Sequence, residues 1–508
     1  MQKHLITLIA GICLTASAAD WPQFFKDNSR NAVSAETNLP AAFVPGTTHL
    51  VDTNAPTPPK TTNLKWRTRL GTHAYGGPVI SNGKIFLGTT NQKQGGMVMG
   101  LDEATGKVLW QLSIPRFSIN LKQYNYDSLN LGICSTPVVE KNRLYLISNR
   151  DDLLCLDTDG KDNGSTAHFT GDTWTVEGCV QQPMSFETEA GGIDWAVHML
   201  TESNVAAWVQ DASASSPIID GDYVYACPCN GVDKSHKKVP HPDTPSLIAV
   251  DKNTGTVIAR DHALVGHRLF HGEWSSPSVG VVNGKKLVFF GGGDGVCYAF
   301  DAAPAPPENN ESIGSLKTVW TFDINAAGGR TGTYKTVAGP SECIAVPVFY
   351  SNRVYASVGQ DPLHKEGRGA LACIDATKTG DITESGKIWV NTNIDRSLTT
   401  VSIADGMLFT ADFSGRIFCM DPDTGKIFWM HETHRPMWSS PLIADGKVYI
   451  GTDTGDLWCF AESKELKILA KTKVDSSISA SPVAANGVLY VMTQRWLYAI
   501  AEGADLKE

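Results

Sequence analysis

Short apolar runs alternate with turn signals along the chain, and the pattern repeats. One unit runs from Ser439-Ser440-Pro441 through an apolar strand and an Asp445-Gly446 turn to a second apolar run ending at Tyr449. Close copies begin at Gly76, Ser215 and Ala480, and weaker copies begin at Ser135, Ser275, Ala345 and Thr399. Tandem units of about 40 residues are typical of repeat folds.

Each unit carries two turn signals. The first is an Asn-Gly or Asp-Gly pair between alternating apolar residues, as at Asn82-Gly83, which is typical of a tight hairpin. The second is an Asp followed by a Thr-Gly turn, as in Asp421 to Gly425. Strands before, between and after these turns give four antiparallel strands per unit. This is one blade of a β-propeller.

The two ends of the repeat array predict how the ring closes. The outermost strand of a unit often carries a tryptophan, at Trp110, Trp195, Trp320, Trp389 and Trp429, which we expect to pack between blades. The eighth unit ends at Ile500 without such a strand, whereas Leu64–Leu70 contains Trp66 and precedes the first unit. We therefore predict an all-β, eight-bladed β-propeller of four-stranded antiparallel blades over residues 63–501, closed by pairing of N-terminal and C-terminal strands.

The segments outside the repeats predict an exported chain. Residues 1–19 combine a basic start, an apolar run from Leu5 to Thr15 and small residues at 16–19, which is typical of a cleaved signal peptide. Residues 20–62 form an N-terminal arm and Pro-rich linker that we expect to run over the surface. Residues 161–192 are an insertion in the second blade, before its Trp195 strand.

Charge and cysteine placement narrow the classes of function. The formal net charge is −10, so a nucleic-acid partner is not expected, and no later apolar run is long enough to span a membrane. Cys155, Cys373, Cys419 and Cys459 occupy a repeat position that holds Gly or Ala in other units. A position that accepts only small residues is tightly packed, so we predict four free, buried thiols.

The Asp-x-x-Thr-Gly-Lys-x-x-Trp pattern, as in Asp421 to Trp429, resembles the PQQ-like (pyrroloquinoline-quinone-like) repeat. Trp21-Pro22-Gln23-Phe24 resembles the start of many exported bacterial proteins that carry this repeat. The resemblance covers most of residues 21–501 and implies an eight-bladed propeller of the quinoprotein dehydrogenase-like type. That group includes quinone-dependent alcohol and sugar dehydrogenases, a lipoprotein scaffold for outer-membrane protein assembly, and exported members of unassigned activity.

The resemblance implies two functions. The enzymes clamp a quinone beside Ca²⁺, and in the alcohol dehydrogenases a disulfide between adjacent cysteines covers one quinone face. This chain has Cys227-Pro228-Cys229 instead of adjacent cysteines, and it has no Cys-x-x-Cys-His haem motif. We assign no catalytic residue and no cofactor, although PQQ and calcium stay in the alternative hypothesis.

Loops that enter the innermost strands should meet around the propeller axis, where propellers usually bind partners. Their polar and aromatic side chains could hold a small polar ligand, or could satisfy one another and the loop backbone. The candidates are His73, Tyr75, His271, Glu273, Trp274, Glu342, Asp395, Arg396, His434, Arg435 and Trp438.

A metal site has weaker support in the sequence. Cys227, Cys229 and His236, with His241 and Cys179, offer ligand types that suit zinc or copper, but their spacing matches no standard motif. We favour either plain burial of the thiols or a disulfide from Cys179 to Cys227 or Cys229.

Two hypotheses about function follow. The first is an exported, periplasmic or extracellular, monomeric binding or scaffold protein that holds a protein or small ligand on its axial face. The second is a PQQ- and calcium-dependent alcohol or sugar dehydrogenase with an atypical cofactor clamp. A scaffold at the outer membrane is a variant of the first, and Ile12 before Cys13 is a poor context for lipidation.

Overall fold

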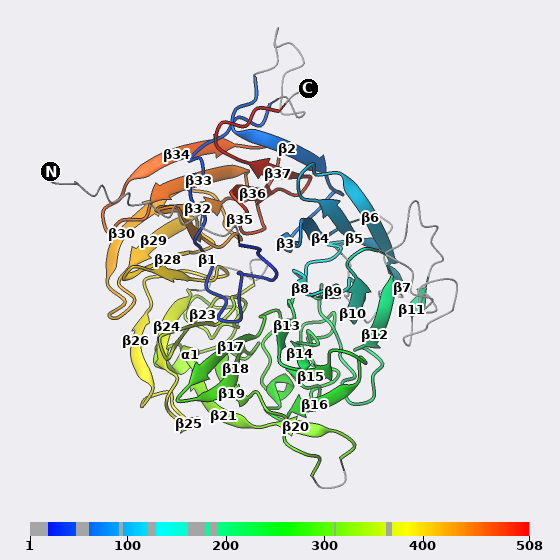
Figure 1. Cartoon of the computed structure of the whole chain (residues 1–508). Helices are drawn as coiled ribbons and strands as arrows, with labels where there is room; N and C mark the ends of the chain where they lie inside the picture. The colour runs from blue at the N-terminus through cyan, green and yellow to red at the C-terminus, as the bar shows by residue number, and fades with distance from the viewer. Residues whose placement is uncertain are drawn as a thin grey trace, which may run out of the picture.

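The chain forms an eight-bladed β-propeller in a computed structural model (Figure 1). The structure describes residues 19–46, 60–90, 95–119, 129–160, 179–181, 192–308, 311–361 and 368–506. The predicted signal peptide (apart from residue 19), part of the predicted linker and most of the predicted 161–192 insertion lie outside these residues. In the described part of the chain, no helix has the length and apolar character to cross a membrane.

Each blade has four antiparallel strands, ordered from the axis outward. The first four blades are β3 (Val79–Ser81), β4 (Lys84–Thr90), β5 (Gly95–Asp102) and β6 (Val108–Pro115); β8 (Val138–Glu140), β9 (Arg143–Ile147), β10 (Asp152–Asp157) and β12 (Ile193–His198); β13 (Ile218–Asp220), β14 (Tyr223–Ala226), β15 (Ile248–Asp251) and β16 (Val257–Asp261); and β17 (Ser278–Val282), β18 (Lys285–Gly291), β19 (Val296–Asp301) and β21 (Thr318–Asp323).

The other four blades follow the same order. They are β22 (Val348–Tyr350), β23 (Arg353–Val358), β24 (Ala370–Asp375) and β26 (Lys387–Asn391); β27 (Ser402–Ala404), β28 (Met407–Ala411), β29 (Arg416–Met420) and β30 (Ile427–Glu432); β31 (Leu442–Ala444), β32 (Lys447–Gly451), β33 (Asp456–Ala461) and β34 (Ile468–Lys473); and β35 (Val483–Ala485), β36 (Val488–Met492), β37 (Trp496–Ile500) and β2 (Leu64–Arg69).

A few short elements decorate the ring. β20 (Gly314–Leu316), β25 (Gly380–Asp381) and β1 (Val33–Ser34) each add a fifth, parallel strand to a blade. β7 (Phe117–Ile119) pairs with β11 (Cys179–Gln181). A 3-10 turn (Val265–His267) and α1 (Ile324–Ala327) are the helical elements of the described residues.

The ring closes as the sequence predicts. β2 pairs antiparallel with β37, so the outermost strand of the last blade comes from the start of the chain. Trp66 lies opposite Ala499, and its indole N–H donates to the carbonyl of Glu103 in the first blade at 3.0 Å. This closure leaves no open side through which the blades could separate.

The recurrent tryptophans pack between blades, as expected. Trp110, Trp195, Trp389 and Trp429 are buried, and each indole N–H donates to a backbone carbonyl of the next blade. The predicted free thiols are also confirmed: Cys155, Cys373, Cys419 and Cys459 are buried and unbridged. Cys155, Cys373 and Cys419 each lie directly opposite the tryptophan of the neighbouring outermost strand.

The predicted surface course of the arm is wrong for its first half. The segment 20–36, which we call the arm plug, crosses the middle of the ring (Figure 1), and Trp21, Phe25 and Arg30 are buried. Its backbone and side chains hydrogen-bond to the innermost strand of each blade, at Ile80, Val139, Ile219, Val279, Phe349, Ile403, Ile443 and Ala484. Inner strands are sheet edges with unpaired backbone groups, and the arm plug satisfies them.

Arg30 holds the arm plug in place. Its guanidinium donates to the carbonyls of Phe24 at 2.7 Å, Pro277 at 2.9 Å and Pro217 at 3.0 Å. Burial lowers the pKa of Arg30 to about 9, so the side chain stays charged at neutral pH. The arm plug therefore closes one end of the axial channel with a tightly bonded core.

Candidate functional site

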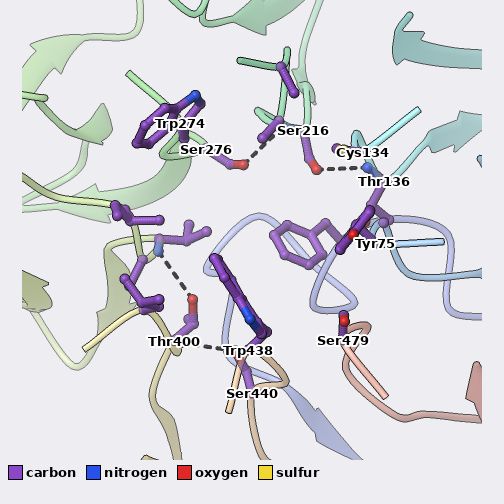
Figure 2. Close-up of a pocket in the computed structure, with 18 of the residues that line it drawn as sticks. Tyr75, Cys134, Thr136, Ser216, Trp274, Ser276, Thr400, Trp438, Ser440 and Ser479 are labelled. Carbon is purple, nitrogen blue, oxygen red and sulfur yellow. Dashed lines mark hydrogen bonds between the residues drawn. The ribbon is translucent and has the colours of Figure 1, made fainter. Parts of the chain in front are cut away.

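A cavity of about 360 Å³, the axial cavity, lies on the propeller axis (Figure 2). Its walls come from the loops that enter the innermost strands, as the sequence predicts for the position of a site. Phe24 and Phe25 of the arm plug, with ring centroids 3.9 Å apart, also line it. Tyr75, Trp274 and Trp438 add aromatic rings from three different blades. The cavity is therefore a largely apolar pocket with five aromatic rings in its lining.

A ring of hydroxyl groups encircles this cavity, and we call it the hydroxyl belt. It consists of the residue before each repeat proline, or the aligned residue, where that residue is Ser or Thr: Thr136, Ser216, Ser276, Thr400, Ser440 and Ser481. Each hydroxyl oxygen accepts the N–H of the equivalent residue in the preceding blade, at 2.8–3.1 Å. The belt joins neighbouring blades around the axis (Figure 2).

The belt is interrupted at two places. Gly77 in the first blade and Val346 in the fifth blade occupy the position of the belt hydroxyl. The N–H groups of Ser481 and Ser276, which would donate to those positions, have no hydrogen-bond acceptor among the described residues. The two interruptions are four blades apart, on opposite sides of the axis.

The charge of the cavity is low and negative. Asp211 and Asp361 are the charged side chains among its described lining residues, which include no Lys, Arg or His. Burial, with Cys134 and Asp453 nearby, raises the pKa of Tyr75 to about 12, so its hydroxyl is neutral at physiological pH. An anionic ligand would therefore find no cationic partner among the described lining residues.

Three of the eleven sequence candidates, Tyr75, Trp274 and Trp438, line the axial cavity. His73 lies beside it, because its ring is parallel to that of Tyr75 with centroids 6.4 Å apart. His434 and Arg435 are exposed, and His434 lies 3.7 Å from the Glu432 carboxylate. These polar residues belong to the surrounding loops rather than to the walls.

His271 and Glu273 are buried behind Trp274. His271 Nε2 lies 2.9 Å from His236 Nδ1, and the His271 ring contacts the Trp274 ring edge-on at 5.0 Å. Burial, with Asp261, Asp294 and Cys229 nearby, raises the pKa of Glu273 well above its usual value. His271 and Glu273 therefore support Trp274 from the side that faces away from the cavity.

Glu342 is a buried structural acid. Its Oε1 accepts the Tyr334 hydroxyl at 3.0 Å and the Asp361 backbone N–H at 2.9 Å. Burial raises the pKa of Glu342 to about 7 in spite of these donors. It thereby holds Asp361, which does line the cavity.

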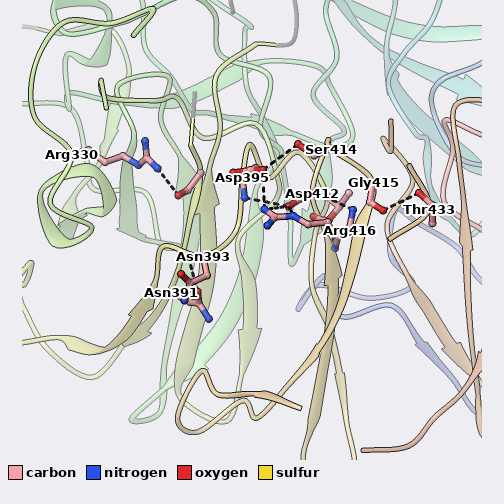
Figure 3. A network of polar contacts seen from close by, with 12 residues as sticks. Arg330, Asn391, Asn393, Asp395, Asp412, Ser414, Gly415, Arg416 and Thr433 are labelled. Carbon is pink, nitrogen blue, oxygen red and sulfur yellow. Dashed lines mark hydrogen bonds and ion pairs between the residues drawn. The ribbon is translucent and has the colours of Figure 1, made fainter. Parts of the chain in front are cut away.

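Asp395 belongs to an ion-pair network outside the cavity (Figure 3). Arg416 bridges the carboxylates of Asp395 at 2.9 Å and Asp412 at 2.6 Å, and the Asp395 N–H donates to Asp412. Arg396 packs its guanidinium 4.9 Å from the Phe413 ring centroid, and Phe413 in turn contacts Trp438 edge-on. Both residues therefore order the loop between the fifth and sixth blades.

The weak metal candidates do not assemble. Cys227 and Cys229 are free, buried thiols, as expected for plain burial, and the side chain of Cys179, their proposed disulfide partner, lies outside the described part of the structure. His236 stacks on His271 with ring centroids 4.8 Å apart. Across the described ranges, no three His, Cys, Asp or Glu side chains gather closely enough to hold a metal ion.

A family model described as outer membrane protein assembly factor BamB matches residues 66–320 and 242–431. Together these ranges cover more than half of the chain. The chain belongs to this PQQ-like repeat family. The same architecture occurs in BamB from Moraxella catarrhalis, with a TM-score of 0.53, 14% identity and coverage of 88% of this chain and 99% of that one.

Dehydrogenases share the propeller too. The quinohemoprotein alcohol dehydrogenase ADHIIG from Pseudomonas putida HK5 has a TM-score of 0.58 at 11% identity, covering 96% of this chain and 81% of that one. Quinoprotein alcohol dehydrogenase PedE of Pseudomonas putida is 37% identical over 73 residues, or 14% of this chain and 11% of its own length. A quinone-dependent alcohol dehydrogenase subunit of Gluconobacter oxydans is 25% identical over 160 residues, 29% of this chain and 19% of its own length.

The walls of the axial cavity do not fit the quinone of the dehydrogenases. PQQ carries three carboxylates, which need cationic partners, and the charged groups among the described lining residues are themselves carboxylates. A calcium ion beside it would need several oxygen ligands, and no three acidic side chains in the described part of the propeller are placed to hold a metal ion. We therefore derive no redox step for this PQQ-like propeller.

The sequence analysis missed two parts of this site, the floor formed by Phe24 and Phe25 of the arm plug and the hydroxyl belt. Phe24 and Phe25 lie far from the loops in sequence, and only the folded arm brings them to the axis. The belt had a visible signal, because a Ser or Thr precedes the repeat proline, or its aligned residue, in six of the eight units.

Proposed function

We propose that this PQQ-like propeller is a binding or scaffold protein that holds a small ligand in its axial cavity. The observation that carries the proposal is the axial cavity of about 360 Å³, which is largely apolar and is lined on one side by Phe24 and Phe25 of the arm plug. Its volume lies in the range of roughly 300–1,000 Å³ that is usual for small-molecule sites. A plugged channel favours a small ligand over a chain threaded along the axis.

The family supports a binding role. Its model is described as an assembly factor for outer-membrane proteins, a task performed by binding other proteins. In this chain Trp438 at the cavity is 37% exposed, and exposed aromatic residues are enriched in binding surfaces. The proposal therefore extends to a protein partner that docks over the same axial face and contacts Trp438.

The cellular setting is part of the proposal. An exported chain, periplasmic or extracellular, agrees with the signal-peptide pattern of residues 1–19. We propose a monomer, and the net charge of −10 argues against nucleic acid as a partner.

The alternative is a PQQ- and calcium-dependent dehydrogenase. Short stretches of similarity to quinoprotein alcohol dehydrogenases support it. The lack of cationic side chains among the described cavity walls argues against it, as does the sequence Cys227-Pro228-Cys229 in place of adjacent cysteines.

An uncharged fluorescent dye tests the proposed site. Prodan, which brightens in apolar surroundings, should bind the full chain with one-to-one stoichiometry. Ala214 lines the cavity, so Ala214→Phe should fill it and abolish binding, whereas Ala104→Phe on an exposed turn should have no effect. Equal binding by the two variants would refute the axial site.

A further inference from the structure

The hydroxyl belt faces the cavity with unused donors. Each belt oxygen already accepts one backbone N–H, which directs the hydroxyl proton elsewhere. Among the described residues, none of the six belt hydroxyls donates to a protein acceptor, and all six line the cavity. A buried donor without a partner is costly, so these protons favour a ligand or water that accepts from them.

Two backbone donors add to this ring. Where Gly77 and Val346 interrupt the belt, the N–H groups of Ser481 and Ser276 have no acceptor in the described part of the chain. Because these N–H groups are four blades apart, donors are available on opposite sides of the axis. A ligand that carries acceptor oxygens around its whole edge would satisfy both.

The remaining walls supply the complementary groups. The carboxylates of Asp211 and Asp361 accept hydrogen bonds, and the rings of Tyr75, Trp274 and Trp438 offer flat apolar faces. The site thus combines neutral donors, acceptors and aromatic platforms, with no cationic side chain among its described lining residues. A ligand matches this combination if its own hydroxyl groups can both donate and accept hydrogen bonds and if they surround an apolar C–H face.

We propose that the axial cavity binds a neutral saccharide of about disaccharide size, held by the hydroxyl belt and stacked on the axial aromatic rings. This assignment rests on the proposed function, since it names the ligand class of the same cavity. It also accounts for the poor fit to PQQ, because a tricarboxylate needs cations where this cavity presents neutral donors.

Calorimetric titration of the full chain with three probes tests the assignment. Cellobiose is the neutral saccharide, PQQ with Ca²⁺ the anion and tetraethylammonium the cation, and we expect binding of cellobiose alone. Thr400→Val removes a belt hydroxyl and should weaken cellobiose binding about three- to tenfold, the usual effect of one neutral hydrogen bond. Thr400→Ser keeps the hydroxyl and should restore it.

A second variant guards against a folding defect in Thr400→Val. Trp438→Ala removes an exposed ring, so the fold should persist while cellobiose binding weakens about tenfold or more, as expected for loss of a buried stacking contact. Wild-type affinity in both variants would overturn the assignment. Binding of tetraethylammonium without cellobiose, or of prodan with none of the three, would overturn the saccharide and leave the proposed function standing. Binding of PQQ with Ca²⁺ instead of cellobiose would overturn the saccharide and favour the alternative dehydrogenase. Failure of prodan as well would overturn both.

Discussion

One repeat position in this propeller holds only small residues because a tryptophan packs against it from the neighbouring strand. Gly100 lies opposite Trp110, and a Cβ built on it would come within 2.5 Å of the indole. Cys373 and Cys419 lie opposite Trp389 and Trp429 in the same way. The position that accepts Gly, Ala or Cys in the repeats is therefore the floor of an indole pocket. This explains why these cysteines are inert packing residues rather than ligands or bridges.

Glu342 gives a pH-dependent prediction at the residue scale. Its pKa rises from 4.5 to about 7 on folding because the carboxyl is buried. The folded state therefore holds a proton that the unfolded state releases between these pH values, so stability falls as pH rises through this window. Glu342→Gln keeps an acceptor for Tyr334 and has no charge to bury.

As pH rises from 4.5 to 7, we expect the free energy of unfolding of wild type to fall relative to that of Glu342→Gln by up to about 3 kcal/mol, at about 1.4 kcal/mol per pKa unit. Urea unfolding of both proteins across this range measures the difference, in which other titrating groups cancel. Parallel stability profiles would show that Glu342 ionises normally in the fold.

The arm plug is the element that turns a ring into a pocket. The innermost strands leave their axial backbone groups unpaired, and the arm plug bonds to all eight of them. Arg30 fastens it through carbonyls of the plug itself and of the third and fourth blades. Because Phe24 and Phe25 line the cavity, the stability of this element and the shape of the site are linked.

Arg30→Ala should therefore damage both stability and the site. The substitution leaves buried carbonyls without a donor and a void on the axis, so we expect a loss of about 2–4 kcal/mol. Urea unfolding measures this loss, and prodan binding should weaken because the floor is no longer fixed. Arg69→Ala, on an exposed part of β2, is the matched control and should change neither.

On the scale of the whole molecule, the propeller depends on one strand pair for closure. β2 reaches β37 from the other end of the chain, and the residues before it in sequence lie in the arm rather than in a neighbouring blade. In every other blade the four strands follow one another within one repeat, with insertions between some of them. Loss of the β2–β37 pair would leave β37 as a sheet edge and open the ring.

Thr68→Pro tests closure. Proline removes a backbone donor and should separate β2 from β37, where Thr68 pairs with Leu497. We expect a larger fall in melting temperature than for Lys471→Pro in β34, an outermost strand of the seventh blade that does not close the ring. Calorimetry measures both, and a larger effect in β34 would mean that closure contributes little.

The repeat could be predicted from the sequence, because each blade is a local unit. Apolar alternation, Asn-Gly or Asp-Gly turns and the Trp66 segment predicted the strands, the number of blades and the closure between β2 and β37. The free thiols followed from comparing equivalent positions. These features depend on contacts within a repeat or between adjacent repeats, which a repeating sequence records many times over.

The axial site depended on the tertiary structure. Of the polar loop residues, Glu273 and Glu342 are buried, and Asp395 is held by Arg416 outside the cavity. The sequence does not show which groups the folded chain brings next to each of these carboxyls. The arm occurs once in the sequence, so no comparison of repeats could predict where it lies. Its Pro-rich composition does not show that it pairs with the innermost strands of the blades. Only closure of eight blades creates the axial gap, and only that gap gives Phe24, Phe25 and the belt hydroxyls a common cavity.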